Sequence, residues 1–188
     1  MKIIGFSGKI GSGKTTGVDY LKSRLEAEGK KVQLVSFADR LRDVVSTMCD
    51  VPVTTLQSQE GKNSVDPQLQ MTYGVILQKV GTGMRKEVDQ QIWVKLALDR
   101  DFSGVDFLLV GDMRFENEAD AIRERGGLLV RVEGDPAGVR ANSKRDLNHI
   151  SETALDTYAG FNVMIYNDSG IDDYYKSLDN VLQFVLSE

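Results

Sequence analysis

Apolar residues along this chain form two patterns that alternate from one end to the other. Short continuous apolar runs predict buried strands, whereas apolar residues spaced three or four positions apart predict helices with one buried face. The runs predict strands at residues 1–6, 32–36, 107–110, 128–132 and 161–165. The spaced residues predict helices from the loop after the first strand to Gly29, and at residues 39–48, 68–81, 87–101, 116–125 and 171–185. This alternation predicts an α/β fold with a five-stranded, mostly parallel sheet and helices on both faces.

Two segments interrupt the alternation. Residues 50–67 are rich in Thr, Gln, Ser and Asn, and a long polar connection of this kind is typical of a functional or mobile loop. Residues 133–150 show no clear periodicity and contain glycines and a proline. We expect a single domain over residues 1–188, in which 133–150 forms a lid-like insertion.

Composition narrows the possible partners. The chain has 188 residues, 41% of them hydrophobic, a net charge of −5 and a sequence pI of about 5.0. This acidic balance argues against binding a nucleic-acid polymer, but a nucleotide needs only a few local positive charges. The chain has a single cysteine, Cys49, and this indicates a reducing cytoplasm. For Cys49 itself, a packed thiol is favoured over a reactive thiol. Because no apolar run has transmembrane length, we expect no membrane partner.

The first strand leads into a phosphate-binding motif. Residues 8–15 read Gly-Lys-Ile-Gly-Ser-Gly-Lys-Thr and fit the P-loop pattern G-x-x-x-x-G-K-[ST] at every fixed position. A flexible Gly/Ser turn is the alternative, but the strand before the motif and the amphipathic helix after it favour a P-loop. We expect a bound triphosphate and Mg²⁺, with Lys14 at the β/γ-phosphates and the Thr15 hydroxyl on the metal. The expected nucleotide-binding set is Gly8, Gly11, Ser12, Gly13, Lys14, Thr15 and Thr16.

A P-loop alone leaves the reaction open. A GTPase needs an N-K-x-D element after a strand, and this chain has none. Large ATPase modules are usually longer than this chain. Small size with two polar inserts instead favours a nucleoside-monophosphate-kinase-like enzyme, in which one segment closes on the acceptor and another on the donor triphosphate.

Two blocks carry a resemblance to one kinase family. Residues 111–119 read GDMRFENEA and resemble the D-[VM]-R-F-x-N-E-A signature of phage-type deoxynucleoside monophosphate kinases. Residues 77–85 read LQKVGTGMR and, with Trp93 downstream, resemble the family's L-Q-x-x-G-T-x-x-x-R block, although Arg85 comes one position early. Weaker likenesses are residues 36–42, the H-x-S-E element at 149–152 and the N-D turn at 167–168. These matches follow the family's order along nearly the whole chain.

This chain departs from the family pattern at two places, and the resemblance implies a function. Gly74 stands where the family often has an arginine, and the segment after Arg131 reads Val-Glu-Gly-Asp where another basic residue is expected. The resemblance implies a P-loop kinase with ATP as donor, Mg²⁺ as cofactor and a deoxynucleoside monophosphate as acceptor. It further implies that residues 37–101 bind the acceptor. It also suggests a homodimer, and a host-cytoplasm location if the gene is phage-borne.

Phosphoryl transfer between nucleotides needs positioning and charge neutralisation, because the attacking phosphate oxygen is already anionic. Asp112 follows a buried strand and is expected to bind Mg²⁺ or its water shell, with a helix N-cap as the alternative. Arg114 is expected to contact the substrate or the transferred phosphate. Its alternative is an ion pair with Glu116 or Glu118.

The 133–150 segment and the last strand supply further candidates. Arg140 and Arg145, with Lys144 between them, are expected to meet the donor phosphates from a lid, or to form a solvated loop face. His149, the single histidine, is expected to be structural. Asn167 and Asp168 follow the last strand and are expected to border the adenine.

The acceptor candidates are arginines and polar side chains between residues 37 and 101. Arg42 and Arg85 are expected to clamp the acceptor phosphate, because guanidinium groups match phosphate oxygens. Arg42 could instead be a solvated helix residue. For Arg85, we expect a helix to end just before it, at residues 81–83, which lets the chain approach a ligand.

For three further acceptor candidates, the sequence leaves two possible roles open. Gln78 could read a base edge or face solvent on a helix. Asp39 could hold a sugar or base, or cap a helix. Trp93 could stack on a base, but its helical spacing with Leu96 favours a core position equally.

Two other functions remain open. One is a different small-molecule P-loop kinase, such as a dephospho-coenzyme A kinase-like enzyme. The other is a nucleotide-binding switch that has no acceptor substrate and hydrolyses its nucleotide slowly.

Overall fold

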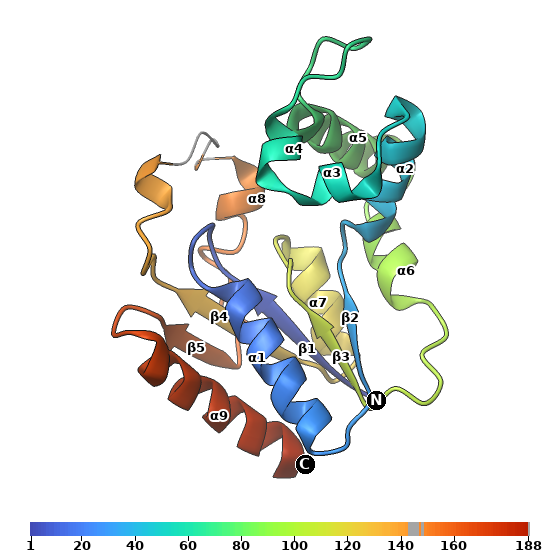
Figure 1. The fold of residues 1–188 in the computed structure, drawn as a ribbon. Helices are drawn as coiled ribbons and strands as arrows, with labels where there is room; N and C mark the ends of the chain where they lie inside the picture. Colours follow the sequence, from blue (N-terminus) through green and yellow to red (C-terminus); the bar gives the residue numbers. More distant parts are fainter. Residues whose placement is uncertain (143–146, 148, 188) are drawn as a thin grey trace. The chain divides into compact units, whose positions relative to one another are not determined.

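The computed structural model describes residues 1–142, 147 and 149–187 (Figure 1). The chain divides into two compact units. Unit 1 comprises Met1–Ser36 and Asp101–Glu188, and unit 2 comprises Phe37–Arg100. Each unit is described here by itself.

Unit 1 is built on a five-stranded sheet in the order β2-β3-β1-β4-β5, and every strand pairing in it is parallel. The strands are β1 (Lys2–Ser7), β2 (Val32–Val35), β3 (Phe107–Val110), β4 (Leu128–Glu133) and β5 (Val163–Tyr166). The expected five-stranded α/β fold is therefore confirmed, and the sheet is wholly parallel.

Helices cover both faces of this sheet. Ile4 and Phe6 of β1 point into a buried cluster with apolar residues of α1 (Lys14–Ala27) and α9 (Ile171–Ser187). Alternate β1 residues face the other way, where α7 (Glu116–Glu124) packs so closely that a Cβ at Gly5 would lie 2.6 Å from Ile122 Cδ1. Figure 1 shows α1 and α9 on one side of the sheet and α7 on the other.

The carboxyl ends of the parallel strands bring chemistry-bearing residues to one edge of the sheet. The phosphate loop follows β1, Ser36 follows β2, Asp112 and Arg114 follow β3, and Asn167 follows β5. Ligands of open α/β sheets bind at this edge, outside the strand ends. The topology therefore gathers residues that lie far apart in the sequence.

The segment between β4 and β5 contains a short 3₁₀ helix, η1 (Arg140–Asn142), and a one-turn helix, α8 (Ile150–Thr153). The Asp135 carboxylate accepts the N–H groups of Val139 and Arg140, each at 2.9 Å. His149 caps α8, because its Nδ1 accepts the Ser151 N–H at 3.2 Å. This is the structural role expected for the single histidine.

Unit 2 consists of helices. They are α2 (Asp39–Cys49), α3 (Val53–Gln57), α4 (Gln59–Asn63), α5 (Tyr73–Glu87) and α6 (Ile92–Leu98). Val45, Leu56, Tyr73 and Ile76 form their buried apolar cluster, and Cys49 packs partly buried against it. Burial raises the pKa of the Cys49 thiol, and the nearby Asp66 carboxylate adds to the shift.

Three local predictions for unit 2 were wrong. The polar connection at 50–67 contains the two short helices α3 and α4. The helix predicted at 68–81 begins only at Tyr73, because the Asp66 carboxylate accepts the N–H groups of residues 68 and 69 and holds them in a turn. The helix predicted at 87–101 is shorter, since α6 spans Ile92–Leu98.

In the described part of the chain, no helix is both long and apolar enough to span a bilayer.

Candidate active site

The phosphate loop joins β1 to α1 and requires its glycines. At Gly13 the backbone φ is +96°, and a Cβ there would lie 2.4 Å from Asn167 Nδ2. At Gly8 a Cβ would lie 2.3 Å from the carbonyl oxygen of Val132. A side chain at either position would clash with a neighbour. The backbone of the loop can therefore take this path only with glycine at these positions.

The loop also leaves a buried polar atom that suits a phosphate. Ser12 is 1% exposed, and among the described residues its Oγ has no hydrogen-bond partner. Buried hydroxyl groups normally have a partner, which an oxygen atom of a bound phosphate would supply. Helix α1 begins at Lys14 with Thr15 and Thr16 exposed in its first turn, so its N-terminus also favours an anion.

Side chains from two later segments donate hydrogen bonds to backbone carbonyls of the loop. Asn167 Nδ2 donates to the Ser12 carbonyl at 3.0 Å, and Tyr174 Oη donates to the Gly13 carbonyl at 2.9 Å. Asn167 is buried, whereas Asp168 after it is exposed. Asn167 therefore fixes the loop backbone in this structure. Its expected contact with adenine, like that of Asp168, stays a prediction.

Lys14 lies in a strongly positive environment. Its Nζ donates to the carbonyl of Lys9 at 2.7 Å. The pKa of the Lys14 ammonium is lowered to about 8, chiefly by burial and in addition by the positive charges of Arg114, Arg131 and Arg140. Glu152 acts in the opposite direction. An excess of cationic groups around one half-buried lysine is the electrostatic setting that a polyphosphate would neutralise.

Asp112 lies beyond the end of β3, where Ser36 at the end of β2 donates a hydrogen bond to its Oδ2. This contact orients the carboxylate. The described residues contain no group of three His, Cys, Asp or Glu side chains that could hold a metal ion. Mg²⁺ in kinases is typically held by one or two carboxylates together with substrate phosphates, so Asp112 and Thr15 suit it as partial ligands.

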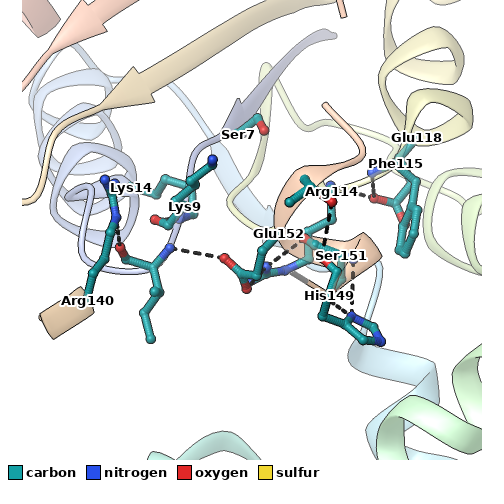
Figure 2. Close-up of polar contacts among 12 residues, drawn as sticks. Ser7, Lys9, Lys14, Arg114, Phe115, Glu118, Arg140, His149, Ser151 and Glu152 are labelled. Carbon is teal, nitrogen blue, oxygen red and sulfur yellow. Dashed lines mark hydrogen bonds and ion pairs between the residues drawn. The ribbon is translucent and has the colours of Figure 1, made fainter. Parts of the chain in front are cut away.

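Arg114 is held at both its backbone and its guanidinium group (Figure 2). Its N–H donates to Glu118 Oε2 at 2.8 Å, and its Nη1 donates to the Ser151 carbonyl at 3.0 Å. Nη1 also pairs with the Glu152 carboxylate. The ion pair considered with Glu116 or Glu118 is therefore not the one formed by the guanidinium, because α8 brings Glu152 to it.

Arg140 also contacts the phosphate loop. Its Nε donates to the Ile10 carbonyl at 3.1 Å, and its Nη2 donates to the Gly134 carbonyl. Arg140 thus lies against the loop in this structure. Arg145 and Lys144, the other cationic candidates of this segment, lie outside the described residues.

Sequence reasoning missed Arg131, which is 4% exposed on β4. Its guanidinium contacts Glu133 at 2.6 Å, Asp156 at 2.9 Å and Ser7 Oγ at 3.1 Å. Asp156 in turn pairs with Lys9 of the loop at 2.7 Å. A single charge inside an apolar strand was the available signal, because such a residue is rarely buried without partners.

The acceptor candidates belong to unit 2 and are described there alone. The Arg42 guanidinium pairs with Asp39 at 2.9 Å, and the Arg42 side chain is 17% exposed. Gln78 is exposed on α5. Trp93 is 2% exposed, and its Nε1 donates to the Gly81 carbonyl at 3.0 Å, so it occupies the core position that the sequence had left open.

The expected helix end before Arg85 was wrong. Helix α5 runs through Gly81 and Gly83 to Glu87, so Arg85 lies in its last turn. Gly81 serves close packing instead, because a Cβ there would lie 3.1 Å from Leu41 Cδ2. Glycine inside a helix can therefore mark a close contact between helices rather than a terminus.

Known proteins resemble this chain in sequence. A putative deoxynucleotide monophosphate kinase of Acanthamoeba polyphaga mimivirus is 28% identical over 95% of this chain and 94% of its own length. The deoxynucleotide monophosphate kinase of Enterobacteria phage T4 is 31% identical over 57% of this chain, a match that spans 44% of the phage protein.

Solved structures resemble it more distantly. A shikimate kinase from Acinetobacter baumannii is 15% identical, with a TM-score of 0.49, over 100% of this chain and 94% of that one. An APS kinase from Mycobacterium tuberculosis is also 15% identical, with a TM-score of 0.49, over 97% of each chain. The model of one family, deoxynucleotide monophosphate kinase, matches residues 54–178 of the 188. The chain belongs to the deoxynucleotide monophosphate kinase family.

Proposed function

We propose that this protein transfers a phosphoryl group from ATP to deoxynucleoside 5'-monophosphates and so forms the diphosphates. The observation that carries the proposal is the cationic group of Lys14, Arg114 and Arg140 around a glycine loop whose Ser12 hydroxyl has no partner in the part of the chain that the structure describes. Family membership supports the kinase activity and a nucleotide acceptor.

The chemistry requires little covalent help from the protein. The acceptor phosphate is already an anionic nucleophile, so no general base is needed. Lys14 and Arg114 neutralise charge that develops on the transferred group, and Arg140 and Arg145 assist at the donor phosphates. These four residues and Asp112 form the proposed catalytic set.

The donor is proposed to lie on the phosphate loop. Gly8, Gly11 and Gly13 expose backbone N–H groups, and Ser12, Thr15 and Thr16 add hydroxyl groups at the N-terminus of α1. Thr15 and Asp112 would hold Mg²⁺, which supplies positive charge beside the donor phosphates. Asn167 and Asp168 would border the adenine.

Unit 2, over residues 37–100, is proposed to supply the acceptor contacts. Arg42 and Arg85 would bind the acceptor phosphate, Gln78 would read a base edge and Asp39 would hold the sugar or base. Trp93 would contribute by holding α5 and α6 together, because its ring is buried.

The wider setting is part of the same proposal. We place the enzyme in the cytoplasm, where ATP is available, and expect it to act on free nucleotides and not on nucleic-acid polymers. A homodimer is expected, and sedimentation of the purified protein would test it.

The decisive experiment measures ADP release with ATP and Mg²⁺ across every deoxynucleoside and ribonucleoside monophosphate. Release that depends on at least one deoxynucleoside monophosphate supports the proposal. Release that stays flat across all acceptors contradicts it and favours a nucleotide switch. A parallel thermal-shift series with dephospho-coenzyme A distinguishes the other small-molecule kinase, since only that enzyme would be stabilised by this compound.

A further inference from the structure

Glu152 makes contacts that the proposed reaction does not yet use. Its side chain is 5% exposed, and its two carboxylate oxygens bond to different parts of unit 1. Oε1 pairs with Arg114 Nη1, and Oε2 accepts the backbone N–H of Ile10 at 3.2 Å. Ile10 belongs to the phosphate loop, so one buried carboxylate joins that loop to Arg114. Figure 2 shows Glu152 between the loop and Arg114.

The geometry of Arg114 explains why this matters. Both of its guanidinium hydrogen bonds, to Glu152 and to the Ser151 carbonyl, are made by Nη1. Among the described residues, its Nη2 and Nε have no acceptor. This edge of the guanidinium is the one that remains to bind phosphate oxygens, and the planar group fixes its direction once Nη1 is held.

The charges around Lys14 also indicate a role for Glu152. Lys14, Arg114, Arg131 and Arg140 are all cationic, and Glu152 is the acidic residue that raises the pKa of Lys14 against their influence. A buried carboxylate in this position offsets part of the repulsion among these cationic groups before a nucleotide binds. It thereby reduces the rearrangement that binding would otherwise require.

We propose that Glu152 is a positioning residue that fixes Arg114 relative to the phosphate loop by bonding the guanidinium through one oxygen and the Ile10 N–H through the other. This inference rests on the proposed kinase function, because Arg114 must act on the reacting phosphate. Glu152 itself acts through Arg114 and the loop. Its element, α8, is in turn held by the His149 cap.

The main test is a double-mutant cycle with Glu152→Ala and Arg114→Ala. Glu152→Ala is expected to lower kcat by about 10²-fold, the scale of a small misplacement of a catalytic group, while the KM for ATP changes by less than about threefold. In the Arg114→Ala background, loss of Glu152 should lower kcat little further, because its effect passes through Arg114. The inference is overturned if kcat of the double variant falls by the product of the two single losses. It is also overturned if Glu152→Ala keeps the wild-type kcat.

A second readout does not depend on the reaction. Hydrogen exchange of the Ile10 amide should be faster in Glu152→Ala than in the wild type, because its acceptor is gone. Unchanged exchange would contradict the loop contact. Asp120→Asn is the matched control, since the Asp120 carboxylate pairs with Arg123 and accepts from Tyr158 without contact to the loop or Arg114. It should leave both readouts unchanged.

Thermal melting establishes that each variant is folded at the assay temperature. If Glu152→Ala is unfolded, the cycle is run with Glu152→Gln, which keeps the side-chain volume and one acceptor oxygen but removes the charge. The same non-additivity is then expected. Failure of the kinase proposal looks different, because the wild type itself would then show no acceptor-dependent ADP release.

Discussion

The phosphate loop of unit 1 and the helices of unit 2 hold their charged residues in different ways. In unit 1, partners come from far along the chain: Arg114 pairs with Glu152, 38 residues later, and Arg140 donates to a carbonyl 130 residues earlier. In unit 2, Arg42 pairs with Asp39, only three residues before it. Long-range contacts bind separate segments into one constellation, whereas a pair within one helix turn fixes only that helix surface.

Because of this difference, we expect substitutions in the two regions to change different kinetic constants. Residues of the phosphate loop are held in place before any ligand arrives, so their loss should act on turnover. Arg42 is proposed to bind the acceptor phosphate, and its ion pair with Asp39 lies within one helix turn. Its loss should act on the KM of the acceptor.

The largest expected effect is that of Lys14→Ala. Removal of the half-buried ammonium should lower kcat with the best acceptor by at least about 10²–10³-fold, because its proposed role is to neutralise charge on the transferred phosphate. ADP release measures the change. Lys22→Ala is the control, since Lys22 is an exposed lysine of the same helix that pairs with Glu26. A Lys14→Ala enzyme with wild-type turnover would remove the phosphate loop from the catalytic set.

The next effect is that of Arg42→Ala on the acceptor. A charged hydrogen bond to phosphate contributes about 1.5–3 kcal/mol, so the acceptor KM should rise about 10–100-fold while the KM for ATP stays constant. Arg40→Ala is the matched variant, because Arg40 lies on the same helix and pairs with Asp43, with half of its side chain exposed. Equal effects of the two variants on the acceptor KM would contradict the proposed role of Arg42 at the acceptor phosphate.

The same contrast explains what the sequence predicted. Strand order along the chain, the phosphate loop and the flanking helix were all predicted correctly, because each depends on residues that are close in sequence. Lys14 and Gly13, for example, lie next to one another in a motif whose spacing reflects backbone geometry. Such features carry their physical cause within a few residues.

Other features depend on contacts that no local pattern contains. Glu152 lies in a one-turn helix, and its role appears only when α8 is seen beside Ile10 and Arg114. The start of α5 was misplaced because the turn held by Asp66 competes with helix formation at residues 68 and 69. Gly81 suggested a helix end, although it allows a close approach of Leu41.

The dependence of ATP affinity on pH tests the charge state of Lys14 in the phosphate loop. The pKa of Lys14 is lowered to about 8, chiefly by burial, and a bound polyphosphate favours the protonated form. Below pH 8 the lysine is already charged. Above pH 8 it must take up a proton on binding, so ATP affinity should fall about tenfold between pH 7 and 9.

Calorimetry in two buffers of different ionisation enthalpy measures this proton uptake. Uptake should approach one proton near pH 9 and vanish near pH 6.5 for this group. Lys14→Arg should abolish the uptake, because a guanidinium keeps its proton throughout this range. No uptake by the wild type at pH 9 would contradict the lowered pKa.

The smallest expected effect concerns Trp93, the one acceptor candidate that unit 2 buries. Trp93→Phe keeps an aromatic ring but removes the donor to the Gly81 carbonyl. The free energy of unfolding should fall by about 1–2 kcal/mol, because a buried carbonyl loses its side-chain partner, whereas the acceptor KM should stay within about twofold. Urea denaturation and acceptor titrations measure the two quantities. A raised KM with unchanged stability would instead mean that the indole stacks on the base, and unit 2 would then bind its ligand with residues that this structure holds in its core.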